Sequence, residues 1–169
     1  MEPGNDNLTS PDRVEGGAPP ADVVARLSHF GICVADLDRS KRFYTGAFGF
    51  QETYSRVVGN DFARLMQRLT YDVEICIMSL DGRLIELIHH RTPPASVEPL
   101  RPTNTVGLTH VAIYVPEVKP AMRRVDEFGG RALPDTFTRL VVNGEEREYV
   151  CVLDPDEVRI ELIQGMPLG

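Results

Sequence analysis

LSHFGICV, Leu27 to Val34, recurs as LTHVAIYV, Leu108 to Val115, and this recurrence organises the whole chain. Counted between the two histidines, the copies are 110 − 29 = 81 residues apart. The copies also close alike, because IELI at 85–88 returns at 160–163. A repeat of this length predicts two copies of one structural unit.

A helix is expected after the opening strand of each copy, because the apolar spacing changes there from alternation to the helical period. The first helix is predicted over residues 38–48, with Asp36 or Asp38 as its N-cap and Gly49 as its end. The second is predicted to end at the glycine pair that begins with Gly129.

Three further strand-like runs follow each helix. They span residues 51–58, 72–79 and 83–89 in the first copy, and 131–142, 147–153 and 158–163 in the second. The sequence therefore predicts an α+β protein with two βαβββ modules in tandem.

Composition sets the module boundaries. Residues 25–90 are assigned to the first module and 107–166 to the second. The proline-rich stretch 91–106 is expected to link them. Residues 1–24 are poor in large apolar side chains, so a disordered tail is expected there.

One segment of the first copy has no counterpart in the second. GNDFARLMQRLT, residues 59–70, has the apolar spacing of a short amphipathic helix, where the second copy has only NGEE. This insertion is predicted either as a lid or dimer element beside the pocket, or as a surface helix of no special role.

Composition and charge argue against several classes of partner. The net charge is -7, the pI is near 5.1 and no Lys/Arg cluster is present, so neither nucleic acid nor a membrane is expected as a partner. Three cysteines in strand-like runs do not suggest a disulfide framework. The N-terminus lacks the basic start and apolar stretch of a signal peptide, so a cytoplasmic location is expected.

Four side chains stand at matching places in the two copies. Alternation along the opening strands puts His29 and His110 on the face away from the helices. A carboxylate, Glu86 or Glu161, interrupts each apolar closing run. Because a lone buried carboxylate is costly, each needs a partner or a proton.

These four side chains are predicted to share one metal ion. A single strand histidine is more often a hydrogen-bonded structural residue, but a repeat related by a pseudo-twofold axis brings equivalent positions around that axis. Two neutral imidazoles and two carboxylates suit one divalent ion such as Zn, Ni, Co, Fe or Mn. The predicted ligands are His29, Glu86, His110 and Glu161.

The paired openings, the helix SKRFYTGAFGF at 40–50 and the ending LDPDEVRIELIQ at 153–164 resemble the vicinal oxygen chelate superfamily, which includes glyoxalases, bleomycin-resistance proteins and extradiol dioxygenases. The resemblance spans residues 27–164. It implies an open, cupped, mixed β-sheet with the helices on its outer side and the metal on the concave side. The family's ligand positions fall on the four residues named above.

The resemblance also implies a metal-dependent enzyme that chelates two adjacent oxygens of a small-molecule substrate. The preferred hypothesis is an isomerase, epimerase or lyase that moves a proton next to a carbonyl through an enolate, with Glu161 as the catalytic base and Glu86 assisting. Four ligands of these types resemble glyoxalase I. Cys33 stands where that enzyme has an arginine for glutathione, which argues against glutathione as a co-substrate.

Two other functions stay open. One is an iron(II) dioxygenase that uses His29, His110 and Glu161. The other is a metal-free protein that binds or sequesters a small molecule, as the bleomycin-resistance members do.

The substrate pocket is predicted to include Cys33, Tyr114 and Arg159, which share the strand parity of the ligands. Packing or surface exposure is the plainer interpretation of each of these residues. A homodimer is expected, because many members of the family pair.

Overall fold

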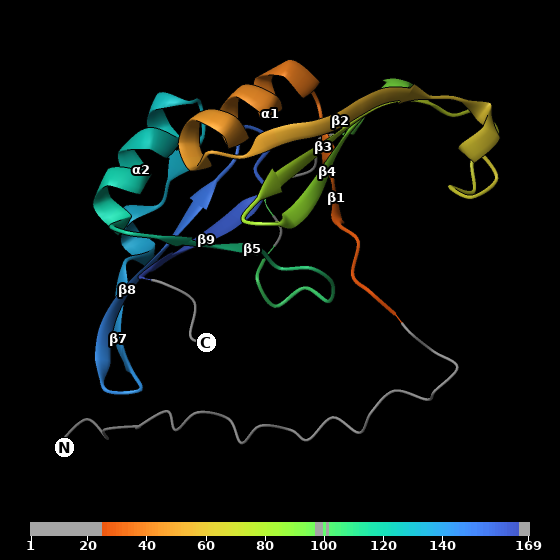
Figure 1. Ribbon diagram of the computed structural model, residues 1–169. Helices are drawn as coiled ribbons and strands as arrows, with labels where there is room; N and C mark the ends of the chain where they lie inside the picture. Colours follow the sequence, from red (N-terminus) through yellow and green to blue (C-terminus); the bar gives the residue numbers. More distant parts are fainter. Residues whose placement is uncertain (1–24, 97–99, 101, 166–169) are drawn as a thin grey trace.

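The computed structural model describes residues 25–96, 100 and 102–165, so the tail predicted at 1–24 lies outside the described residues. The strands form two sheets, one from each copy of the repeat, and the helices gather on one side of them (Figure 1). Within the described ranges, no helix has the length and apolar character needed to cross a bilayer.

The first module begins with a strand and a capped helix. Its elements are β1 (Phe30–Val34), α1 (Leu37–Phe43), the π-helical η1 (Tyr44–Phe48), β2 (Gln51–Val58), the 3-10 turn η2 (Asn60–Phe62), β3 (Asp72–Leu80) and β4 (Arg83–Thr92). The sheet order is β1-β4-β3-β2, with β1 parallel to β4. As predicted, Asp36 caps α1 by accepting a hydrogen bond from the Arg39 backbone N–H, and Gly49, with φ of 83°, ends the helical segment.

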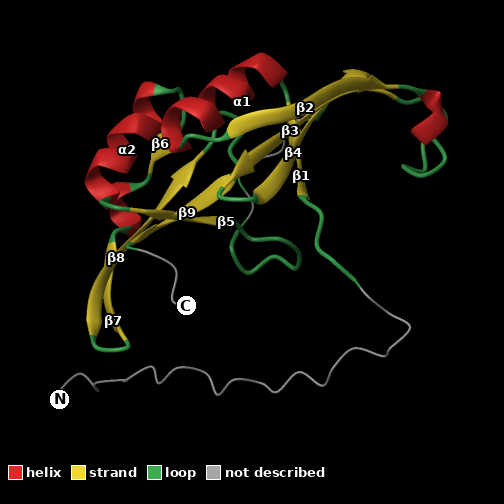
Figure 2. Ribbon diagram, viewed as in Figure 1, coloured by secondary structure: helices red, strands yellow, loops and turns green. Residues whose placement is uncertain are grey.

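The second module repeats this plan (Figure 2). Its elements are β5 (Val111–Val115), α2 (Val118–Glu127), β6 (Arg131–Ala132), the 3-10 turn η3 (Pro134–Thr136), β7 (Thr138–Val142), β8 (Glu145–Leu153) and β9 (Arg159–Gln164). The order is β5-β9-β8-β6, β5 is parallel to β9, and β7 pairs with β8. The prediction of an α+β fold with tandem modules is confirmed.

The strand predicted over 131–142 is divided in two. β6 and β7 are separated by η3, which begins at Pro134. Proline has no backbone N–H to donate to a ladder, so a continuous strand cannot run through this position without losing a hydrogen bond.

The amphipathic helix predicted for the insertion at 59–70 is wrong. The segment forms the short turn η2 and then hydrogen-bonded turns, and Gln67 adopts a left-handed conformation with φ of 52° that an α-helix does not accommodate. Leu65 and Leu69 are 70% and 101% exposed, so the apolar spacing does not create a buried helix face.

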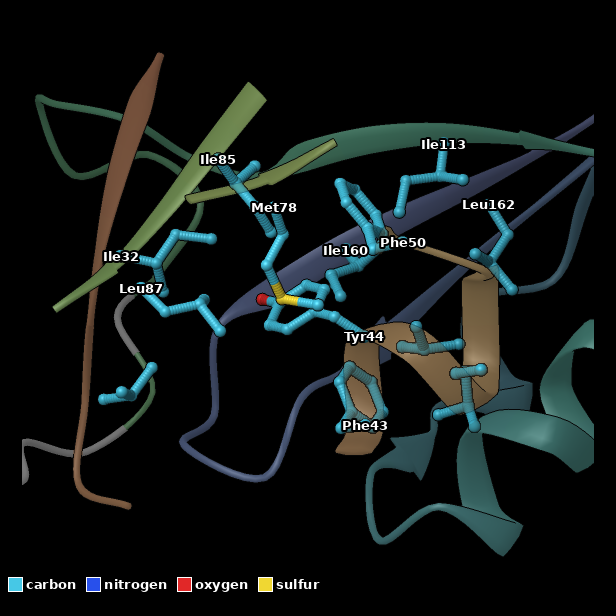
Figure 3. Packing of buried hydrophobic residues seen from close by; sticks show 14 of the residues in the cluster. Ile32, Phe43, Tyr44, Phe50, Met78, Ile85, Leu87, Ile113, Ile160 and Leu162 are labelled. Carbon is cyan, nitrogen blue, oxygen red and sulfur yellow. The ribbon is translucent and has the colours of Figure 1, made fainter. Parts of the chain in front are cut away.

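The core lies where the helices meet both sheets. Figure 3 shows Phe43 and Tyr44 among side chains of the two modules, including Met78 and Ile160, and all four are buried. In β1 the buried side chains alternate with exposed Gly31 and Cys33, and β5 repeats this pattern. The strand faces therefore lie as the alternation predicts, with the faces away from the helices left open.

Polar contacts also tie the turn between β8 and β9 to α1 and η1. Buried Asp154 accepts hydrogen bonds from the Tyr44 hydroxyl at 3.0 Å and from two backbone N–H groups of its own turn at 2.8 Å each. Asp156 forms an ion pair with Arg39 and accepts a hydrogen bond from Ser40. These contacts fix one module against the other.

Asp154 is expected to make stability depend on pH. Burial raises its pKa from 3.8 to about 6, so between these values the folded chain holds a proton that the unfolded chain has lost. The stabilisation is complete below pH 3.8 and disappears as the pH rises through about 6. The free energy of unfolding should therefore fall by up to about 3 kcal/mol across this window from this group alone.

The measurement is urea unfolding of the wild type and Asp154→Asn from pH 4 to 8. The amide keeps an acceptor for the backbone N–H groups but does not ionise, so the free-energy difference between the two proteins should change with pH. Tyr44→Phe keeps the carboxyl and should keep the pH dependence. A difference that is constant over the range would contradict this assignment.

Candidate metal-binding site

The first histidine and glutamate of the predicted ligand set form a pair in the first module. His29 directly precedes β1, and Glu86 lies in β4 opposite Gly31. The Nε2 atom of His29 lies 3.2 Å from Oε2 of Glu86, and its Nδ1 atom lies 2.9 Å from the Ser28 hydroxyl. The hydroxyl contact at Nδ1 leaves Nε2 directed toward the carboxylate.

The second module contains the same arrangement. His110 precedes β5, and Glu161 of β9 lies opposite Ala112. The Nε2 atom of His110 lies 3.5 Å from Oε2 of Glu161, and its Nδ1 atom lies 2.8 Å from the Thr109 hydroxyl. Each half of the chain thus presents one imidazole nitrogen and one carboxylate oxygen side by side.

The structure brings the four predicted ligands together as two pairs but does not unite the pairs within the chain. Across the described residues, no three His, Cys, Asp or Glu side chains form a group that could hold a metal ion. One pair alone offers two donors, fewer than the four ligands of an ordinary tetrahedral site.

A large cavity lies between the two modules. Its volume is about 1280 Å³, and its lining includes His29 and His110 together with residues of β1 and β5. Cys33, Tyr114 and Arg159, predicted as substrate-binding residues, also line this cavity. Their assignment to substrate remains a prediction.

The strands that flank this cavity have open edges. Among the described residues, β1 and β5 are each paired on one side only, at the ends of their sheets. Leu27 and Leu108, at equivalent places in the repeat, are 77% and 78% exposed, and Phe30 is 45% exposed. Open strand edges beside exposed apolar side chains are typical of surfaces that bind another chain.

One wall of the first module's open face was not predicted. Tyr71 and Ala63 are buried, and with Phe62 they cover the end of the sheet, including Ile75 of β3 and Ile88 of β4. The sequence held a signal for this wall, because β3 is apolar on both faces and a strand of that kind is covered on both sides.

Comparisons with known proteins identify the family. The chain matches the model of the Glyoxalase/Bleomycin resistance protein/Dioxygenase superfamily over residues 26–162. Lactoylglutathione lyase of Salmonella typhimurium is 27% identical over 144 residues, covering 85% of this chain and 96% of that protein.

Solved structures share the fold. A glyoxalase family protein from Bacillus cereus superposes with a TM-score of 0.76 at 19% identity, covering 89% of this chain and 100% of that one. The fosfomycin resistance protein FosX from Listeria monocytogenes, complexed with Mn(II) and sulfate, gives a TM-score of 0.58 at 18% identity, covering 85% of this chain and 95% of that one. With the two matching halves and the family match across most of its length, this chain belongs to the Glyoxalase/Bleomycin resistance protein/Dioxygenase superfamily.

Proposed function

We propose that this protein is a metal-dependent isomerase, epimerase or lyase that moves a proton next to a carbonyl in a small substrate with adjacent oxygens. The observation that carries the proposal is the pair of matching His–Glu contacts, each with a hydroxyl at the outer imidazole nitrogen. A single ion held by both pairs would account for the repeated imidazole, carboxylate and hydroxyl together.

The donor set fits a divalent ion. Two imidazoles and two carboxylates are a usual combination for Zn, Ni, Co, Fe or Mn, and the two carboxylates balance the charge. When bound, such an ion polarises substrate oxygens and stabilises the negative charge that develops on them. The residues proposed to hold it are His29, Glu86, His110 and Glu161.

A homodimer is proposed to complete this site. The two pairs lie apart in one chain, while β1 and β5 keep open edges and exposed leucines. If the β1 edge of one chain meets the β5 edge of another, the first pair of one chain faces the second pair of the other. Twofold symmetry then produces two equivalent sites in the dimer.

Glu161 is the better placed of the two carboxylates to carry the proton. Its side chain is 30% exposed, against 17% for Glu86. A base must reach the substrate carbon, so the more accessible carboxylate is assigned this role and Glu86 supports it.

Metal analysis tests the proposal. Protein prepared without chelators should contain about one ion per chain, as twofold symmetry requires. His29→Ala and His110→Ala should each weaken metal binding by at least about 100-fold, because each removes a ligand. His90→Ala is the matched control, because His90 lies outside both pairs and packs edge-on against Tyr71 with ring centres 5.7 Å apart. Equal metal content in all four proteins would reject the site.

The same protein separates the alternative functions. Solvent deuterium appearing at a substrate carbon, in a panel of 2-oxo acids, acyl thioesters, hemithioacetals and catechols, supports proton transfer. Oxygen uptake with a catechol would instead indicate an iron(II) dioxygenase. A chain that binds a small molecule without any metal would indicate a sequestering protein.

A further inference from the structure

Arg56 occupies the open face of the first sheet rather than its helix-covered face. It lies opposite Ile75 in the pairing of β2 with β3, and Ile75 lies opposite Ile88 of β4. Glu86 and Ile77 occupy the neighbouring row of the same face. Partners in these ladders share a face, so Arg56 stands on the side of the sheet that carries the proposed metal ligand.

Aromatic rings hold the Arg56 guanidinium. Its central carbon lies 5.3 Å from the centre of the Phe62 ring and 5.9 Å from that of Tyr54. Among the described residues, no carboxylate lies within ion-pair distance of it. Guanidinium groups held by rings rather than by carboxylates keep their hydrogen-bonding fork available for an anion.

A second arginine lies near the same end of the sheet. The backbone N–H of Arg68 donates a hydrogen bond to the carbonyl of buried Ala63 at 2.8 Å, so Arg68 belongs to the segment that covers the end of the sheet. No ion pair joins Arg68 to a carboxylate in the described part of the chain. In a protein of net charge -7, two cations without acidic partners on one wall form a local positive region.

The surface between Arg56 and Glu86 is apolar. Ile77 lies between Glu86 and Tyr54 in one row across the sheet, and the Arg56 guanidinium lies over the Tyr54 ring. Ile75 and Ile88, in the next row, lie under the cover of Tyr71, Ala63 and Phe62. Two interstrand spacings correspond to about 10 Å across the sheet. A ligand that reaches from the proposed ligand pair to the guanidinium therefore needs a carbon chain between its two ends.

We infer that the substrate carries a second anionic group, a carboxylate or a phosphate, at the end of a short apolar chain, and that Arg56, aided by Arg68, binds this group. The inference rests on the proposed function for the other end of the substrate. Arg56 is a specificity-determining residue in this scheme, because it touches the remote group and not the reacting carbon.

Matched pairs of acids test the inference. 2-Oxoadipate and 2-oxohexanoate have the same chain length and differ only in the remote carboxylate, and 2-oxo-5-phosphonopentanoate presents a phosphonate at the same place. Calorimetric titration of protein loaded with Mn²⁺ should show about tenfold or tighter binding of at least one remote anion over 2-oxohexanoate, since charge-assisted hydrogen bonds are strong. The tighter of the two anionic probes identifies the group that the wall recognises.

Arg56→Gln should reduce this preference to about threefold or less, and Arg56→Lys should keep part of it. Arg139→Gln is the matched control. Arg139 also lies over a ring, that of Phe137 at 5.5 Å, but it lies in the second module and forms an ion pair with Glu148 at 2.9 Å. It should leave the preference unchanged. Metal content and melting temperature are measured on each variant. Unchanged values show that the substitution has not unfolded the segment of Phe62, Ala63 and Tyr71.

Failure of the inference and failure of the proposed function give different results. Metal-loaded protein with no preference for either anionic probe, or an Arg56→Gln variant that keeps the full preference, overturns the role of Arg56 and leaves the metal site standing. Protein that binds no metal but still prefers a remote anion through Arg56 supports this inference and rejects the metal-dependent function.

Discussion

Two variants that each bind no metal should regain a site when they are combined in one dimer. The first variant carries His29→Ala and Glu86→Ala, and the second carries His110→Ala and Glu161→Ala. If each site takes one pair from either chain, both homodimers contain only damaged sites. A heterodimer contains one site with four intact ligands and one with none, so its metal content should be about half that of the wild type.

The measurement uses two affinity tags and co-expression, followed by purification over both tags and elemental analysis. A dimer of two wild-type chains with the same tags sets full occupancy. The alternative is a site assembled within a single chain. In that case every chain of the heterodimer is damaged, and the mixed protein should contain no more metal than either parent.

Replacing Glu161 with glutamine should nearly abolish turnover while leaving metal in place. The amide oxygen can still act as a ligand, but an amide cannot accept and return a proton at neutral pH. General-base contributions of this kind amount to about 10²- to 10⁴-fold in rate. The expected result is a loss of that size in deuterium wash-in at the substrate carbon, with bound metal unchanged.

Glu157→Gln is the control for this experiment. Glu157 lines the cavity between the modules but forms a surface ion pair with Arg131 at 2.7 Å, so its replacement should have little effect on turnover. Full activity of the Glu161→Gln protein with metal bound would show that another group carries the proton.

The fold could be predicted from the sequence because each element is expected independently in both copies of the repeat. A strand or helix expected in one copy is supported by its equivalent in the other, and the caps Asp36 and Gly49 mark the helical segment where the residue types predict it. The unduplicated segment, 59–70, had no such support. Its apolar spacing predicted a helix that does not form, since Leu65 and Leu69 find nothing to pack against.

The relative placement of the two modules could not be predicted from periodicity. It depends on contacts between residues far apart in the sequence, such as the hydrogen bond from Tyr44 to Asp154, which are 110 positions apart. For the same reason, the repeat indicated the four candidate ligands but not their relative positions. It did not predict that His29 and Glu86 would lie apart from His110 and Glu161 within one chain.

For the proposed reaction, the insertion in the first module would have a stereochemical consequence. The ligand pairs repeat almost identically in the two modules. The cover over the end of β2 and β3 has no counterpart among the described residues of the second module, whose β7–β8 hairpin projects at the opposite end of the molecule (Figure 1). A pocket with two identical halves would bind a planar substrate equally well in either of two orientations. Unequal walls can select one enantiotopic side, so the handedness of the product would be set by the part of the chain that the duplication does not share.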